Sequence, residues 1–262
     1  MLALKLALVP GFLAALTMAG RVWGPSVAGW LAGLPVVAGP IVLLLALERG
    51  TDFAAQASAA SIAAIAASEA FNFAYAWTCR VSRWPAALLA GLIAWVLVAV
   101  LLTHLPSGLA WSLAAACVAV GVSQAGLPRV EGVVPAARIS VADLSLRMLA
   151  GAVLTLAVTT LSASMGAAWS GVLSVFPLLG IVLAVSAQRA HGAPFVALLM
   201  RGMVIGRASF AAFFSVVALM LPTFGVLPAF ACGAVVSVIV QGATKRLLAM
   251  SRKPRAPLAA LD

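Results

Sequence analysis

Long apolar runs separated by short polar segments occupy nearly the whole chain. Each run has about the 20 residues that a helix needs to cross a bilayer core of ~30 Å. A membrane β-barrel would instead show alternating segments of about 10 residues. The pattern therefore predicts an all-α polytopic membrane protein with nine transmembrane helices. They are expected at Leu2–Met18, 26–47, Phe53–Trp77, Trp84–Leu102, Leu109–Ala125, Leu146–Ser162, Ser170–Ala187, Pro194–Met220 and Leu227–Leu248.

The two halves of the chain match one another at a constant offset of 142 residues, without gaps. The matched pairs are Leu4 and Leu146, Thr17 and Thr159, Gly29 and Gly171, Pro35 and Pro177, Gly50 and Gly192, Phe53 and Phe195, Phe71 and Phe213, and Gly91 and Gly233. We interpret this as a duplication of four helices. Repeat one then covers 1–103, a connecting helix and linker cover 104–145, repeat two covers 146–250, and 251–262 is a basic tail.

The distribution of Lys and Arg predicts the orientation of the helices. A single extra span between two four-helix repeats makes the second repeat begin on the opposite side of the membrane, so the repeats are inverted. The side that contains the N-terminus receives only Lys5 and Arg49. The other side receives Arg21, Arg80, Arg83, Arg129, Arg138, Arg147, Arg189, Lys245, Arg246, Arg252, Lys253 and Arg255. Because cytoplasmic loops carry the excess of basic residues, we expect the N-terminus outside and the C-terminus inside a bacterial inner membrane.

Composition excludes several other classes. The residues are 65% hydrophobic and 8% charged, and the net charge of +10 comes from loops between apolar runs, so it indicates membrane topology rather than nucleic-acid binding. Cys79, Cys117 and Cys232 stand alone in apolar surroundings and lack metal-ligand spacing, so we expect buried hydrophobes and no metal. The first apolar run resembles a signal peptide, but its repetition at Leu146–Thr159 favours a permanent span.

Two of the expected spans contain helix-breaking residues at matching places. Pro35, Gly39 and Pro40 lie in the second span, and Pro177 and Gly180 lie in the seventh. Interrupted helices at corresponding positions of inverted repeats are typical of secondary transporters, which bind substrate near the bilayer midplane. The alternative is that these prolines only kink two packed helices.

Gly29 and Gly33 form a small-xxx-small face in the second span. Such faces let helix backbones approach closely. Packing within the chain is the favoured interpretation, and a homodimer interface is the alternative.

Charged residues inside spans are functional candidates because burying charge in a membrane is costly. Glu69 lies in the third span, and Arg201 and Arg207 lie in the eighth. At ~1.5 Å per residue, Glu69 and Arg201 have similar depths and are expected to pair, with Asn72 one turn away. Arg207 would then remain free near the midplane and bind an anion. The alternative for Arg201 is that it snorkels to the interface.

Enzymatic motifs are absent from the sequence. There is no HExxH, no pair of carboxylates within one span and no glycine-rich phosphate loop, and His104 and His191 fall at helix ends on opposite sides. We therefore expect neither an enzyme nor a bound cofactor.

The second half resembles the small bacterial GlpM-type membrane proteins. The resemblance rests on Leu-Arg-Met-Leu-Ala-Gly from 146, Ser-Gly-Val-Leu-Ser-Val-Phe-Pro from 170, Leu-Leu-Met-Arg-Gly-Met from 198 and Ala-Ala-Phe-Phe from 211. It covers about 146–220 and, more loosely, 4–78. The first half departs from it, because Leu34 replaces the Phe and Ala60-Ser61 replaces Gly-Met. The resemblance implies a four-helix ancestor and a role in envelope lipid or polysaccharide export.

Two functions follow from these observations. The first is an inner-membrane transporter or flippase for an anionic small molecule or lipid-linked precursor, with membrane lipid and that anion as its partners. The second is a non-transporting subunit of an envelope or exopolysaccharide assembly complex, in which the buried charges are structural.

Overall fold

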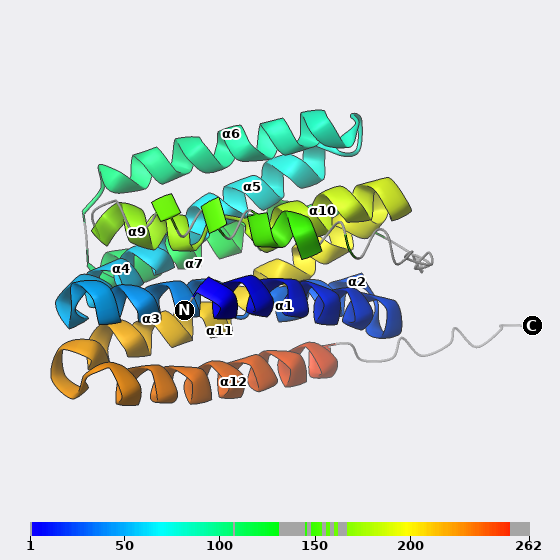
Figure 1. Ribbon diagram of the computed structural model, residues 1–262. Coiled ribbons are helices and arrows are strands. Elements are labelled where there is room, and N and C mark those ends of the chain that lie inside the picture. The colour runs from blue at the N-terminus through cyan, green and yellow to red at the C-terminus, as the bar shows by residue number, and fades with distance from the viewer. Residues whose placement is uncertain are drawn as a thin grey trace, which may run out of the picture.

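The described part of the chain is a bundle of helices without strands (Figure 1). The computed structural model describes residues 2–106, 108–130, 145, 148–153, 156–157, 160–161 and 167–251. The helices are α1 (Leu2–Trp23), α2 (Pro25–Ala32), α3 (Ala38–Arg49), α4 (Thr51–Ala63), α5 (Ile65–Thr78), α6 (Trp84–Thr103), α7 (Leu109–Gly126), α9 (Ala167–Ser174), α10 (Leu178–His191), α11 (Ala193–Phe224) and α12 (Val226–Ser251). The prediction of an all-helical fold is confirmed for these residues.

Within the described residues, five helical segments are long and apolar enough to cross a membrane, which indicates a membrane-embedded protein. They are Trp84–Thr103, Leu109–Gly126, Ala168–His191, Ala193–Phe224 and Val226–Arg246. The first three predicted spans correspond in position to α1, to the α2–α3 pair and to the α4–α5 pair. Parts of the predicted sixth span (146–147, 154–155, 158–159 and 162), most of the linker before it and the tail 252–262 lie outside the described residues.

The second and seventh spans are both interrupted, at 33–37 and 175–177. Helix α9 begins and ends 142 residues after α2, and α10 ends 142 residues after α3 but begins two residues earlier than that offset gives. The pairs run in opposite directions, with α2 and α10 near one end of the bundle and α3 and α9 near the other (Figure 1). Gly50 and Gly192 hold φ of 90° and 79° at equivalent turns, a conformation in which a Cβ is unfavourable.

The third span is not the single helix that the sequence predicts. It divides at Ala64 into α4 and α5, whereas its counterpart α11 is continuous over 32 residues. Ser58 and Ser61 donate to the carbonyls of Ala54 and Ala57, four residues earlier, a pattern that can bend a helix. Ser215 makes the same bond to Ala211 in α11, which stays continuous, so these bonds alone do not account for the division.

Glycines allow two equivalent close crossings at the centre of the bundle. A Cβ on Gly29 of α2 would overlap the carbonyl oxygen of Leu199 on α11, and one on Gly171 of α9 would overlap that of Ala57 on α4. Both glycines and both carbonyl partners are related by the 142-residue offset. The Gly29–Gly33 face therefore packs within the chain, against Gly202 and Gly206 of α11.

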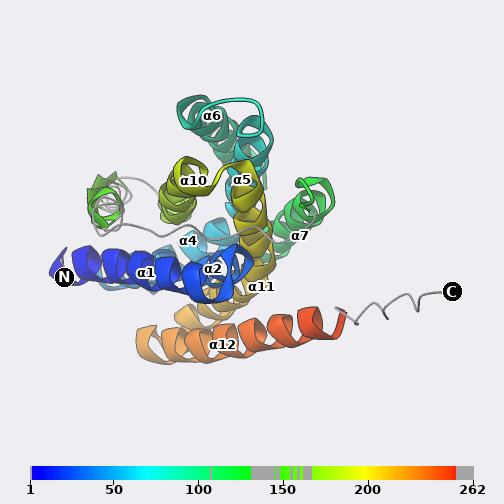
Figure 2. The same cartoon turned by 90° about the vertical axis from the view of Figure 1, so that its right-hand side faces the viewer.

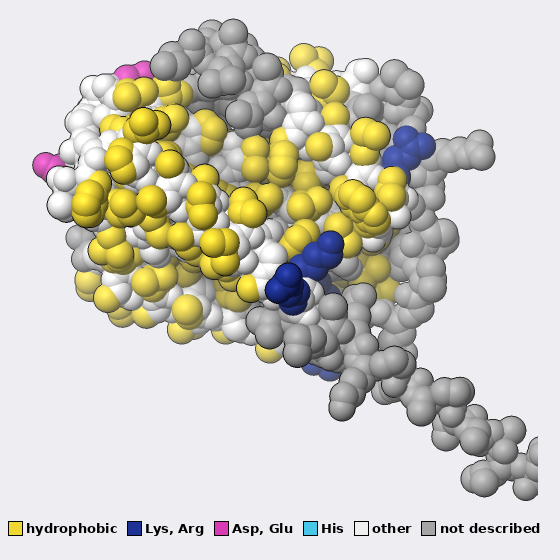
Figure 3. Space-filling model, turned by 90° about the horizontal axis from the view of Figure 1, so that it is seen from below, with side chains coloured by type: hydrophobic (Ala, Val, Ile, Leu, Met, Phe, Trp, Pro, Cys, Tyr) yellow, Lys and Arg dark blue, Asp and Glu magenta, His cyan; other side chains and the backbone are white. Residues whose placement is uncertain are grey.

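The outer helices present apolar side chains to the surroundings. Figure 2 shows α6, α7 and α12 around the central α11, and all three expose large aliphatic residues such as Leu97, Val118 and Val238. Figure 3 shows the apolar side chains as a broad band, with basic residues gathered towards one end and acidic residues at the other. This arrangement fits a bilayer around the bundle.

Candidate functional site

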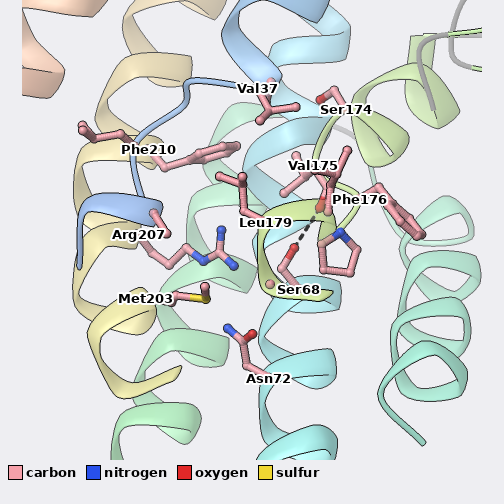
Figure 4. Close-up of a pocket in the computed structure, with 16 residues that line it drawn as sticks. Val37, Ser68, Asn72, Ser174, Val175, Phe176, Leu179, Met203, Arg207 and Phe210 are labelled. Carbon is pink, nitrogen blue, oxygen red and sulfur yellow. Dashed lines mark hydrogen bonds between the residues drawn. The ribbon is translucent and has the colours of Figure 1, made fainter. Parts of the chain in front are cut away.

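A small cavity of about 50 Å³ lies where the two interrupted helices meet α5 and α11 (Figure 4). A water needs roughly 10–15 Å³ of such volume, so the space holds a few waters or a compact polar group. The polar side chains that line it come from three elements: Ser68 and Asn72 from α5, Ser174 from α9 and Arg207 from α11. The site thus combines an apolar wall with a few polar groups, as ligand sites do.

The two interrupted helices contribute equivalent residues to the cavity wall. The pairs at the 142-residue offset are Ala32 and Ser174, Leu34 and Phe176, Val37 and Leu179, and Ala38 and Gly180. The cavity therefore lies where the two halves of the sequence meet. The polar groups do not follow this relation, because Ile65 and Phe214 stand in the positions equivalent to Arg207 and Asn72.

Glu69 and Arg207 form a buried ion pair beside the cavity. The Nε–H of Arg207 donates to Oε1 of Glu69 at 2.8 Å, and Nδ2 of Asn72 donates to the same oxygen at 3.2 Å. The Glu69 side chain is 1% exposed and that of Arg207 is 11% exposed. The predicted Glu69–Arg201 pair, with Arg207 left unpaired, is therefore wrong.

Arg201 instead lies outside the cavity. Its Nη1 donates to the carbonyl oxygen of Leu127, just beyond the end of α7, at 2.9 Å. Depth along the membrane normal does not determine the direction in which a helical residue points, and six residues separate Arg201 from Arg207 on α11. The long arginine side chain also covers the difference in depth between Arg207 and Glu69.

The ion pair leaves hydrogen-bonding capacity unused. Within the described residues, Oε2 of Glu69 is buried without a donor, and the two terminal nitrogens of Arg207 make no hydrogen bond. Figure 4 shows the guanidinium pointing into the cavity, across from Asn72 and Leu179. A guanidinium has five N–H donors, so Arg207 can keep Glu69 and still bind an anion through its outer edge.

The predicted hinge residues take two kinds of position. Pro35 lies within the interruption at 33–37, and Pro177 is the residue that precedes α10. Gly39 and Pro40 lie in the first turn of α3, and Gly180 lies in that of α10, where the missing N–H of a proline costs nothing. The first turn of α10 borders the cavity, so its partial positive charge adds to that of Arg207.

Serine side chains tie the interrupted seventh span to α4 and α5. Ser68 donates to the carbonyl of Val175 at 2.9 Å, a bond drawn in Figure 4, and Ser61 lies 2.9 Å from the Ser174 hydroxyl. The carbonyl of Gly171 accepts from both Ser61 and Ser174. These bonds satisfy carbonyls that the end of α9 leaves without helical partners. These bonds were not predicted from the sequence, although serines within an apolar span were a visible signal.

A second polar cluster joins the end of α5 to α10, and the sequence analysis missed it too. Tyr75 is fully buried, and its hydroxyl donates to Oε1 of Gln188 at 2.9 Å. Nε2 of Gln188 donates to the Ser82 carbonyl at 2.9 Å. Burial raises the pKa of the nearby Cys79 thiol to about 11, so Cys79 remains a neutral thiol at physiological pH. An amide within an apolar span was the available signal.

Comparison with known proteins adds no relative, because no family model, no curated protein and no solved structure matches this chain. Among the described residues, no group of three or more His, Cys, Asp or Glu side chains could hold a metal ion.

Proposed function

We propose that this chain is a membrane transporter for an anionic substrate, with alternating access between two inverted repeats of four helices. Nine spans, an outside N-terminus and a cytoplasmic C-terminus in a bacterial inner membrane belong to the same proposal. The observation that carries it is the unused guanidinium edge of Arg207, which faces a cavity between two interrupted helices. Three observations support the duplication. Helices α2 and α9 have the same boundaries at the 142-residue offset, and residues at this offset line the cavity in pairs. The two interrupted spans also run in opposite directions.

The substrate is held by Arg207, with Asn72, Ser68 and Ser174 as further hydrogen-bonding groups in the cavity wall. When Glu69 and Arg207 are both ionised, their charges cancel and the cavity carries no net charge. A bound anion adds a net negative charge at low dielectric, which is costly. Protonation of Glu69 removes that charge, so we assign Glu69 the role of proton acceptor in proton-coupled binding.

Pro35 and Pro177 supply the flexible points of the mechanism. Each interruption lacks the continuous hydrogen-bond ladder of a helix, so its two half-helices can change their relative angle at lower cost. Gly180 keeps the first turn of α10 narrow where it borders the cavity, whereas Gly39 and Pro40, in the first turn of α3, do not line it. Arg201 is assigned no contact with substrate, because it is bound to the end of α7.

Ligand-dependent thermal stabilisation of the detergent-purified protein tests this proposal. The panel contains phosphate, glycerol 3-phosphate, carboxylates and phospholipids, with Arg207→Gln as test variant and Arg201→Gln as matched control on the same helix. An anion at 100 times its dissociation constant stabilises by about 2.7 kcal/mol. We expect this effect in the wild type and in Arg201→Gln but not in Arg207→Gln. An effect that persists in Arg207→Gln, or no effect for any anion, would overturn the proposal and favour a non-transporting subunit.

A further inference from the structure

An apolar groove on the outer side of the bundle reaches the same arginine. It has a volume of about 270 Å³ and runs between α7 and α11, over Ile65 of α5. Its walls include Leu113, Val120 and Val204, and Arg207 lines it at one point. Arg207 is thus shared by the groove and by the cavity between the interrupted helices.

The groove opens towards the lipid side of the bundle. Cys117 and Ala208, which line it from the two helices, are exposed, as are Val118 and Val122 further along α7. Helix α7 and the middle of α11 belong to segments that are long and apolar enough to cross a membrane. In the proposed topology, what they expose at this depth meets acyl chains rather than water. The described structure therefore gives Arg207 a lateral, apolar approach.

An apolar groove that opens to lipid would not bind a soluble anion, because moving a charged solute into hydrocarbon is energetically costly. The cavity behind Arg207, at about 50 Å³, is also much smaller than the groove. The pairing of a small polar cavity with a larger apolar groove matches a molecule with a compact anionic group and a hydrocarbon chain. The Arg207 guanidinium suits phosphate, which it binds through two parallel N–H groups.

We propose that the anion is the phosphate headgroup of a membrane lipid, which enters sideways between α7 and α11. The headgroup binds the outer edge of Arg207, and an acyl chain lies along the groove. This inference rests on the proposed function and narrows its substrate to an anionic phospholipid-like amphiphile. It makes the protein a lipid transporter or flippase rather than a carrier of a soluble metabolite.

Native mass spectrometry of the detergent-purified full chain tests this with three probes. Phosphatidic acid carries headgroup and chains, phosphatidylcholine carries matched chains without net negative charge, and glycerol 3-phosphate is the soluble headgroup. Ala208→Trp fills the groove from α11. Ala114→Trp places the same bulk on α7 at an exposed position that does not line the groove.

We expect phosphatidic acid to bind the wild type at least about tenfold more tightly than either other probe. Arg207→Gln should remove the preference for phosphatidic acid over phosphatidylcholine. Ala208→Trp should weaken phosphatidic acid binding by about tenfold, while Ala114→Trp leaves it unchanged. If Ala208→Trp does not fold, a bulky thiol reagent on Cys117 in a Cys232→Ser background blocks the same groove.

The results separate the two proposals. Arg207-dependent binding of glycerol 3-phosphate as tight as that of phosphatidic acid would overturn the lipid inference and leave the anion transporter standing. Undiminished phosphatidic acid binding with a blocked groove would also overturn it. If Arg207→Gln binds all three probes as the wild type does, the lipid inference falls, and the proposed function falls with it if the thermal-shift panel is equally insensitive to Arg207.

Discussion

Among single residues, the buried charges of Glu69 and Arg207 cost the most free energy at the cavity, because both are removed from water. Removing two charges from water costs several kcal/mol per ion, and their attraction repays this only when the remaining hydrogen-bonding groups are satisfied. Here Oε2 of Glu69 has no donor in the described structure. Replacing a buried ion pair by apolar residues is often neutral or stabilising, so stability alone does not account for these charges, and this favours the proposed role in anion binding.

Arg207→Gln should destabilise the protein by about 3–5 kcal/mol, because it leaves the Glu69 carboxylate buried without its cation. Adding Glu69→Gln should restore most of this loss. Denaturant unfolding in detergent of both single variants and the double variant checks the prediction. Equal stability of Arg207→Gln and the wild type would mean that the pair is not formed in the folded protein.

Glu69→Gln should strengthen anion binding. The Glu69 carboxylate lies 2.8 Å from Arg207 and repels an anion bound at the same guanidinium, and glutamine removes this charge while keeping the size of the side chain. Dissociation constants of one anion for the wild type and for Glu69→Gln, measured at one pH, check this. Equal or weaker binding in the variant would contradict it.

At the scale of helices, the paired glycine crossings hold the interrupted spans against α11 and α4. Gly29→Ala and Gly171→Ala each place a methyl group against a backbone carbonyl that has no room to move. Each should cost about 1–3 kcal/mol by overpacking. Gly121→Ala on α7 is the matched control, because it meets no atom within 4 Å and improves helix propensity. Equal thermal stability of all three variants would refute the crossings.

The sequence was informative about helices wherever a residue type dictates backbone conformation. Pro35 and Pro177 lack a backbone donor, so the interruptions beside them could be predicted, and Gly50 marked a turn. The division at Ala64 could not, because nothing in an alanine and serine run specifies where it bends. The pairing of Glu69 with Arg207 was missed for a related reason. Residue counts give the depth of a side chain in the membrane, but pairing also depends on the direction in which α11 presents each arginine.

At the scale of the molecule, the face drawn in Figure 3 has basic residues towards one end and acidic residues at the other. The account places the loop 79–83 in the cytoplasm and the loop 104–108 outside. Alkaline phosphatase fused after Gly108 should therefore be active, and a fusion after Arg83 inactive, because the enzyme folds only outside the cytoplasm. The reverse pattern would invert the orientation, and two active fusions would refute the span between them.

The proposed duplication would also account for the central cavity of the molecule. Equivalent residues from both interrupted helices line it, so a rocking motion of one repeat against the other would expose it first to one side of the membrane and then to the other. A structural subunit needs no such exposure. Access to the cavity is therefore the property that separates transport from the alternative function.

Labelling of single cysteines tests alternating access most directly. Val37→Cys and Leu179→Cys, each in a chain without Cys79, Cys117 and Cys232, place one thiol on each half of the cavity wall. Ala99→Cys is the control, because Ala99 is buried and does not line the cavity. With a membrane-impermeant maleimide, the account predicts that both cavity thiols react in right-side-out and in inside-out vesicles, while the control reacts in neither. Labelling of the cavity thiols from one side alone, or from neither, would contradict it.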